Sequence, residues 1–187
     1  MKSPPSNNQS KRRVLGAILA GGRARRFGSD KALALWNGVR LIDCVAKALE
    51  AQCEDIVLCG REEPGFVTLP DHPNGDLGPL GGLNAALRHA AANGYTHARS
   101  AGVDAPNLPS DLKDRLNGEG AAIVESQPVV GWWPSALQPE LNAFLAEGGR
   151  ALYGFAERAR ARRVTLNAPL MNINRPTDLD GPSGEPS

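Results

Sequence analysis

A loop rich in glycine and basic side chains follows the first apolar run of the sequence, Val14–Leu19. Its glycines and cations are Gly21, Gly22, Gly28, Arg23, Arg25, Arg26 and Lys31. Glycines let a backbone approach a ligand closely, and successive N–H groups can line an anion site. Arginine offers phosphate a planar fork, and lysine offers a point charge. The loop therefore suits a nucleoside triphosphate, although a basic loop that only connects a strand to a helix has a similar composition.

The spacing in this loop excludes two common nucleotide motifs. The loop lacks the Gly-x-x-x-x-Gly-Lys-Ser/Thr pattern of a Walker phosphate loop. It also lacks the Gly-x-Gly-x-x-Gly pattern of dinucleotide-binding folds. Phosphate recognition here needs a different arrangement of the same residue types.

Two aspartates are candidates for the rest of the site. Asp104 follows the strand-like segment His97–Val103, where its carboxylate could bind Mg²⁺ together with phosphate oxygens. Aspartate before Ala105-Pro106 is also a common turn residue. Asp71 follows the predicted strand at 66–69 and precedes a glycine-rich run, where its carboxylate could accept hydrogen bonds from a ligand.

Composition narrows the class of ligand. The chain has 187 residues and a net charge of +1, which gives no overall attraction to nucleic acid or to a membrane surface. Its apolar runs are far shorter than the roughly 20 residues that span a bilayer. The three cysteines and three histidines show no zinc-ligand spacing, so we expect reduced thiols and a cytoplasmic protein. A small phosphorylated ligand is the expected partner.

Predicted strands and helices, which must position these residues, alternate along the chain. Apolar runs predict strands at 14–19, 55–59, 66–69, 97–103, 121–125 and 128–133, with a final extended segment at 163–173. Helical patterns cover 39–52, 79–92, 134–146 and 150–162, and a further helix opens near Leu108. We expect a single three-layer α/β/α domain at 12–180 with a mainly parallel sheet, between disordered tails at 1–11 and 181–187. Ligands then bind beyond the carboxyl ends of the strands.

The first loop also carries a specific resemblance. Leu-Ala-Gly-Gly-Arg-x-x-Arg-Phe-Gly-x-Asp-Lys, from Leu19 to Lys31, resembles the signature of the molybdenum cofactor guanylyltransferases, within the wider sugar-nucleotidyltransferase-like superfamily. Phe27 stands where that family usually has methionine. The resemblance extends over roughly residues 13–180 and implies a Rossmann-like nucleotidyltransferase fold.

The resemblance implies roles for individual residues. The backbone of Leu19, Ala20, Gly21 and Gly22 would dock the nucleotide, and Arg26 and Lys31 would lie along the phosphates. Val103-Asp104-Ala105-Pro106 is similar to the family's metal motif, which makes Asp104 the Mg²⁺ ligand. Asp71 matches the family's nucleoside-contacting aspartate, where it would accept hydrogen bonds from the guanine edge or from ribose hydroxyls. Asn172 and Asn174 would lie near the metal and the acceptor phosphate, although asparagines before Pro176 are also ordinary turn residues.

The implied reaction is the transfer of GMP from GTP to the phosphate of molybdopterin or its molybdenum-loaded form, with release of pyrophosphate. The resemblance also implies that this protein makes transient contacts with other proteins of molybdenum cofactor biosynthesis. Two alternatives stay open: a cytidylyltransferase on the same pterin, and a nucleotide-binding accessory protein without catalysis. The Gly21-Gly22 pair and Asp30 before Lys31 favour guanine within the family.

Some positions depart from the family pattern or remain open. Gly60 replaces an asparagine that contacts the nucleoside, and Gln127 replaces a histidine in a segment expected to face the acceptor. Arg150 could reach a phosphate or begin a solvated helix. Trp132 and Trp133 could stack on a pterin, but neighbouring strand residues point to opposite faces, so at least one belongs to the core.

Overall fold

The computed structural model describes residues 12–21, 30–75 and 77–180. The tails expected at 1–11 and 181–187 lie outside the described residues. Strands are β1 (Val14–Leu19), β2 (Leu35–Trp36), β3 (Val39–Arg40), β4 (Asp55–Cys59), β5 (Val67–Leu69), β6 (His97–Gly102), β7 (Ala122–Val124), β8 (Gln127–Pro134) and β9 (Arg162–Val164). Helices are α1 (Leu41–Glu50), α2 (Pro79–Ala92), α3 (Leu112–Leu116), α4 (Gln138–Ala146) and α5 (Leu152–Arg158). Three short 3₁₀ turns cover Lys31–Leu33, Ser135–Leu137 and Pro176–Asp180.

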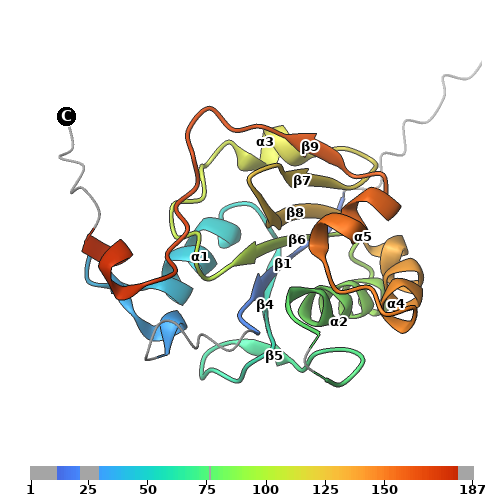
Figure 1. Cartoon of the computed structure of the whole chain (residues 1–187), viewed down its shortest axis with the longest axis horizontal. Coiled ribbons are helices and arrows are strands. Elements are labelled where there is room, and N and C mark those ends of the chain that lie inside the picture. The colour runs from blue at the N-terminus through green and yellow to red at the C-terminus, as the bar shows by residue number, and fades with distance from the viewer. Residues whose placement is uncertain (1–11, 22–29, 76, 181–187) are drawn as a thin grey trace, which may run out of the picture.

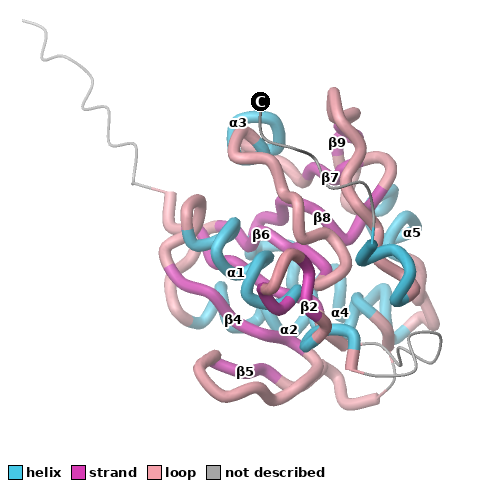
Figure 2. Tube along the Cα trace, turned by 90° about the vertical axis from the view of Figure 1, so that its left-hand side faces the viewer, coloured by secondary structure: helices cyan, strands magenta, loops and turns pink. Residues whose placement is uncertain are grey.

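The central sheet has seven strands in the order β5-β4-β1-β6-β8-β7-β9. β8 runs antiparallel to both its neighbours, and the other pairings are parallel. In Figure 2 the strands follow one another from β5 at the bottom to β7 and β9 at the top. The predicted mainly parallel sheet is therefore confirmed, with one antiparallel strand inserted beside its centre.

Helices cover both faces of the sheet, as Figure 1 shows. Apolar residues of α2, α4 and α5 pack on one face, around Leu83, Leu141 and Phe155. Those of α1 and α3 pack on the other, around Val45 and Leu112. Each fully buried side chain of this size contributes roughly 1.5–3 kcal/mol by leaving water. The packing of helices on both faces of the sheet confirms the predicted three-layer architecture.

The adjacent tryptophans of β8 divide between the two cores. Trp132 belongs to the face covered by α1 and α3, and Trp133 belongs to the opposite face. Their exposures are 1% and 0%, so both are core residues and neither can stack on a pterin in this conformation. The indole Nε1 of Trp132 donates to the Gly118 carbonyl at 3.0 Å, and that of Trp133 donates to Ser100 Oγ at 3.0 Å.

The hairpin β2–β3 is absent from the sequence-based prediction, which began a helix at Val39. The chain instead forms two short antiparallel strands around Asn37 and Gly38, both with positive φ (51° and 80°). Asn-Gly is the preferred pair for such a two-residue turn. The helix then begins at Leu41.

Other differences concern the ends of elements. α3 begins at Leu112, four residues after the predicted start, because the segment before it forms turns. The extended segment predicted for 163–173 is a strand only as far as Val164. α2 has the bounds predicted, Pro79–Ala92, with Pro79 in its first turn. In the described part of the chain, no helix is long and apolar enough to cross a membrane.

Candidate functional site

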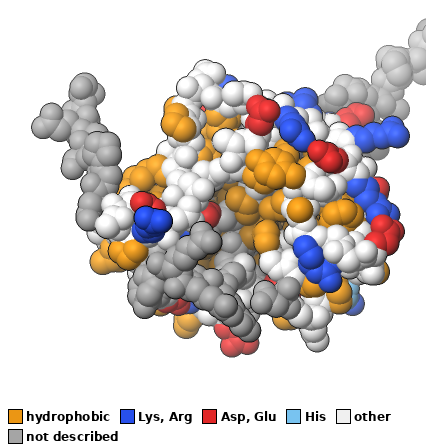
Figure 3. Space-filling view, viewed as in Figure 1, with side chains coloured by type: hydrophobic (Ala, Val, Ile, Leu, Met, Phe, Trp, Pro, Cys, Tyr) orange, Lys and Arg blue, Asp and Glu red, His pale blue; other side chains and the backbone are white. Residues whose placement is uncertain are grey.

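Three parallel strands bring their carboxyl ends to one edge of the sheet. Leu19 at the end of β1 pairs in register with Cys59 of β4 and Gly102 of β6. The residues that follow these strand ends, including Gly60 and Asp104, therefore lie at the same edge. Of the predicted nucleotide-binding loop, Gly22 and Arg26 lie outside the described residues. On the face drawn in Figure 3, the described basic and acidic side chains are scattered around hydrophobic ones, and neither sign of charge forms a large patch among them.

The loops after β1 and β4 touch each other through two glycines. A Cβ on Gly60 would lie 2.5 Å from Gly21 Cα and 2.7 Å from its nitrogen. Gly60 also has a φ of +83°, and its N–H donates to the Leu69 carbonyl at 3.0 Å. Any side chain at position 60 would push the two loops apart. Glycine at position 60, in place of the asparagine of the family pattern, allows this contact.

Asp71 lies beside this glycine contact. A Cβ on Gly60 would approach Asp71 Oδ1 to 3.2 Å, and one on Gly81 would approach Oδ2 to 3.0 Å. The carboxylate thus lies between the β1 and β4 loops and the first turn of α2, where several glycines leave it room. Burial, and then this carboxylate, raise the pKa of Cys59 to about 12. That thiol stays protonated and cannot serve as a nucleophile near neutral pH.

A Gly60→Ala variant tests the contact between the loops. Alanine at a positive φ costs about 1–3 kcal/mol, and the 2.5 Å approach to Gly21 Cα adds to this. We expect a lower free energy of unfolding in urea and a higher KM for the nucleotide. The matched control is Gly65→Ala, because Gly65 has a φ of +91° and open space where the Cβ would stand. Equal effects of the two substitutions on KM would contradict the role of the contact.

Lys31 joins the β1 and β6 loops to the C-terminal segment. Its Nζ lies 3.4 Å from Asp104 Oδ2 and 3.4 Å from Asn174 Oδ1. The Lys31 side chain is only 14% exposed, so water screens its charge less than at a free surface. Asn174 Nδ2 in turn donates to Asn172 Oδ1 at 2.8 Å. The structure thus brings four predicted site residues into one chain of contacts.

Backbone hydrogen bonds hold the C-terminal segment in place. The Ile173 N–H donates to the Asp104 carbonyl at 3.0 Å. Asp178 Oδ2 accepts from the N–H groups of Asn174 and Arg175, both at 2.8 Å. These two hydrogen bonds lower the pKa of Asp178. Asp178 was not among the predicted site residues, yet it fixes the backbone that presents Asn174.

Gln127, in the segment expected to face the acceptor, is buried against the C-terminal segment. It is 8% exposed, and its Nε2 donates to the carbonyls of Leu170 (3.3 Å) and Met171 (2.9 Å). It therefore lies beneath the C-terminal segment.

Arg150 follows α4, where its Nη1 donates to the carbonyls of Leu145 (2.9 Å) and Gly149 (2.6 Å). This nitrogen of Arg150 thus closes the end of α4.

The oxygen ligands of the site fit a divalent cation. Asp104 Oδ2 and Asn174 Oδ1 already converge on one cation, the ammonium of Lys31. Among the described residues, no group of three or more His, Cys, Asp or Glu side chains could hold a metal by itself. A hard cation bound here would rely on one carboxylate and on phosphate oxygens and water, as is usual for Mg²⁺.

Comparison with known proteins identifies the family of the chain. Residues 16–163 match the model of the MobA-like NTP transferase domain. A molybdenum cofactor guanylyltransferase of Cereibacter sphaeroides is 40% identical over 89% of this chain and 94% of its own length. A probable molybdenum cofactor guanylyltransferase of Deinococcus radiodurans is 41% identical, with 90% and 93% covered.

A solved structure shares the fold. The molybdopterin-guanine dinucleotide biosynthesis protein A of Archaeoglobus fulgidus superimposes with a TM-score of 0.71, at 22% identity, over 89% of this chain and 95% of that one. The family model covers most of the sheet and the loops after β1, β4 and β6. The chain therefore belongs to the MobA-like NTP transferase family and is a nucleotidyltransferase.

Proposed function

We propose that this protein transfers GMP from GTP to the terminal phosphate of molybdopterin or of its molybdenum-loaded form, with release of pyrophosphate. The observation that carries the proposal is the placement of Lys31 against Asp104 and Asn174, at the edge where the glycine loops meet. The names of the curated relatives support guanine rather than cytosine, and support catalysis rather than an accessory role.

The nucleotide would lie over the ends of β1 and β4. Backbone groups of Leu19, Ala20, Gly21 and Gly22 would dock it. The Arg26 side chain, with that of Lys31, would neutralise charge on the phosphate oxygens. Gly60 contributes backbone only, because a side chain there would strike Gly21. Asp71 would accept hydrogen bonds from the nucleoside, through either the guanine edge or the ribose hydroxyls.

The acceptor phosphate would attack the α-phosphorus of GTP in line, and pyrophosphate would leave. A phosphate monoester is largely ionised near pH 7, so the attacking oxygen needs no general base. Catalysis then comes from positioning and from stabilising the charge that develops on the phosphate oxygens. Lys31 would supply that charge. Asn172 and Asn174 would form the floor on the acceptor side, held by Asp178.

Asp104 would hold a divalent cation, Mg²⁺ in this proposal, with Asn174 Oδ1 close by. When bound, the cation would neutralise charge on the phosphate oxygens and help to orient them. An ionised carboxylate has two oxygens and about four lone-pair sites, so Asp104 could hold the cation while the Lys31 ammonium stays beside Oδ2. Lys31 would face the phosphates from that position. The proposal places the protein in the cytoplasm, where the free thiols of Cys44, Cys53 and Cys59 stay reduced.

The direct test is an incubation with molybdopterin, Mg²⁺ and either GTP or CTP, each labelled in the α- or the γ-phosphate. We expect the α-label of GTP in a pterin dinucleotide and the γ-label in pyrophosphate. Transfer from CTP at an equal or higher kcat/KM would contradict the guanine assignment. Tight GTP binding without pyrophosphate release would contradict transfer.

A further inference from the structure

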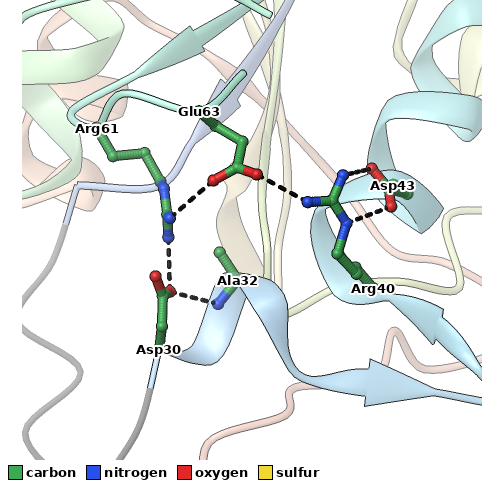
Figure 4. A network of polar contacts seen from close by, with 6 residues as sticks. All are labelled: Asp30, Ala32, Arg40, Asp43, Arg61 and Glu63. Carbon is green, nitrogen blue, oxygen red and sulfur yellow. Dashed lines mark hydrogen bonds and ion pairs between the residues drawn. The ribbon is translucent and has the colours of Figure 1, made fainter. Parts of the chain in front are cut away.

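A chain of alternating charges connects the loop that carries Lys31 to the loop after β4. Its members, drawn in Figure 4, are Asp30, Arg61, Glu63, Arg40 and Asp43. The three carboxylates and two guanidinium groups come from three separate segments: the residues after the β1 loop, the end of β3 with the start of α1, and the residues after β4. None of the five was predicted as a catalytic or binding residue, although Asp30 belongs to the first-loop signature that favours guanine. The transfer reaction described above gives none of them a role.

Arg61 lies between Asp30 and Glu63 in this chain of charges. It follows directly on Gly60, and its Nη1 donates to Asp30 Oδ1 at 2.6 Å. Its Nη2 donates to Glu63 Oε2 at 3.1 Å. Figure 4 shows the guanidinium group pointing between the two carboxylates. Arg61 therefore ties the turn at Gly60 to the residue that precedes Lys31.

Asp30 connects Arg61 to the turn that carries Lys31. The same oxygen, Oδ1, accepts from the Ala32 N–H at 3.2 Å and so caps the 3₁₀ turn Lys31–Leu33. Because Lys31 is the first residue of this turn, the orientation of the turn sets the direction in which its side chain leaves the backbone. Asp30 is thus bound on one side by Arg61 and on the other side by the backbone of the turn that carries Lys31.

Glu63 fixes Arg61 from the far side. The Glu63 side chain is 10% exposed, and its Oε1 accepts from Arg40 Nη1 at 2.7 Å. Arg40 itself is held by both oxygens of Asp43, at 2.7 and 2.9 Å. Isolated exposed ion pairs contribute little to stability, but several charges that form a network constrain one another's geometry. The fork of Arg61 is therefore oriented before any ligand binds.

We propose that Arg61 is a positioning residue for the transfer reaction, which holds the Lys31 ammonium in place through Asp30. The inference rests on the proposed function, because it assigns Lys31 the charge-stabilising role. Arg61 would not touch the substrate. It would keep the nucleoside side of the site, at Gly60, in a fixed relation to the phosphate side, at Lys31. Small displacements of a catalytic group cost up to about 10²-fold in rate, so such a connection affects turnover.

The test is a double-mutant cycle between Arg61→Met and Lys31→Ala. We expect Arg61→Met alone to lower kcat on the order of 10-fold, with KM for GTP changed less than about threefold. In the Lys31→Ala background the same substitution should leave kcat unchanged, because its effect passes through Lys31. Asp30→Asn keeps an oxygen for Ala32 and removes the charge, so it should reproduce the loss in kcat even if Arg61→Met folds poorly.

The matched control is Arg115→Met. Arg115 forms an ion pair of 2.7 Å with Asp111 on α3, and its carbonyl accepts from Arg162 at the start of β9, at the opposite edge of the sheet. This variant also loses an arginine in an ion pair, but its kcat should equal that of the unmodified protein. An equal fractional loss of kcat from Arg61→Met with and without Lys31 would overturn the positioning role.

A second readout needs no acceptor. In ¹⁵N-labelled protein, the Lys31 ammonium signal should differ from those of exposed lysines because of its contacts with Asp104 and Asn174. We expect Arg61→Met, and not Arg115→Met, to shift this signal toward the exposed lysines. If the unmodified protein transfers no GMP while this shift occurs, the proposed function fails and the positioning of Lys31 stands. If transfer occurs and the signal does not move, the positioning role fails alone.

Discussion

A Lys31→Ala variant is expected to lose about 10²–10³-fold in kcat for transfer of GMP, because it removes a preorganised charge that acts mainly in the transition state. The Lys31 side chain is 14% exposed and lies among groups from three segments, so water cannot replace its ammonium effectively. Removing it also leaves Asp104 Oδ2 without its 3.4 Å partner. The measurement is the rate of pyrophosphate release at saturating GTP and acceptor.

The control for this substitution is Lys47→Ala. Lys47 is exposed in the last turn of α1, far along the helix from the site edge, and alanine is the best helix former. Its kcat should be that of the unmodified protein. A Lys31→Ala protein that is folded and turns over at the normal rate would remove Lys31 from the mechanism. A loss confined to KM would assign it uniform binding of the nucleotide instead.

The sequence could predict the elements whose signals are local. The apolar runs of β1 and β4 and the pattern of Pro79–Ala92 gave those elements correctly. The β2–β3 hairpin also had a local signal, Asn37-Gly38, which the helical pattern after Val39 obscured. A strand of two residues is too short to show a period, so turn chemistry alone could have revealed it.

The C-terminal segment could not be predicted in the same way. Beyond β9 its position depends on side chains that bond its backbone from distant parts of the chain. Gln127 Nε2 donates to the Met171 carbonyl at 2.9 Å, and Asn107 Oδ1 accepts from the Met171 N–H at 2.7 Å. Such contacts leave no periodic pattern. Only the resemblance to a known motif drew attention to Asn172 and Asn174.

Some features of the candidate site could also be predicted from the sequence, and others could not. Residue type and position at strand ends were sufficient to select Lys31, Asp71 and Asp104 as candidates. The Arg61–Asp30 contact was not accessible, because charged loop residues 31 positions apart give no signal of pairing. The sequence also could not reveal the need for glycine at position 60, because it arises from the close approach of the Gly21 backbone. These features depend on how two loops meet and not on either loop alone.

An Asp104→Asn variant should lose on the order of 10²–10³-fold in kcat, since a metal ion at a transferring phosphate contributes several kcal/mol. Asparagine preserves the shape of the side chain, and the backbone contact from the Ile173 N–H to the residue 104 carbonyl does not depend on it. The fold should therefore persist. The substitution removes the only carboxylate among the groups that contact Lys31 Nζ in the described residues.

Metal binding separates this effect from the loss of the ion pair with Lys31. With Mn²⁺ as the probe, electron paramagnetic resonance should show weaker binding to Asp104→Asn than to the unmodified protein in the presence of GTP. Lys31→Ala should bind Mn²⁺ at least as well as the unmodified protein, because it frees Asp104 Oδ2 from a competing cation. Unchanged Mn²⁺ affinity in Asp104→Asn would exclude Asp104 as the ligand. Opposite effects of the two substitutions on metal binding, with similar losses in kcat, would show that the carboxylate and the ammonium act on the phosphates separately.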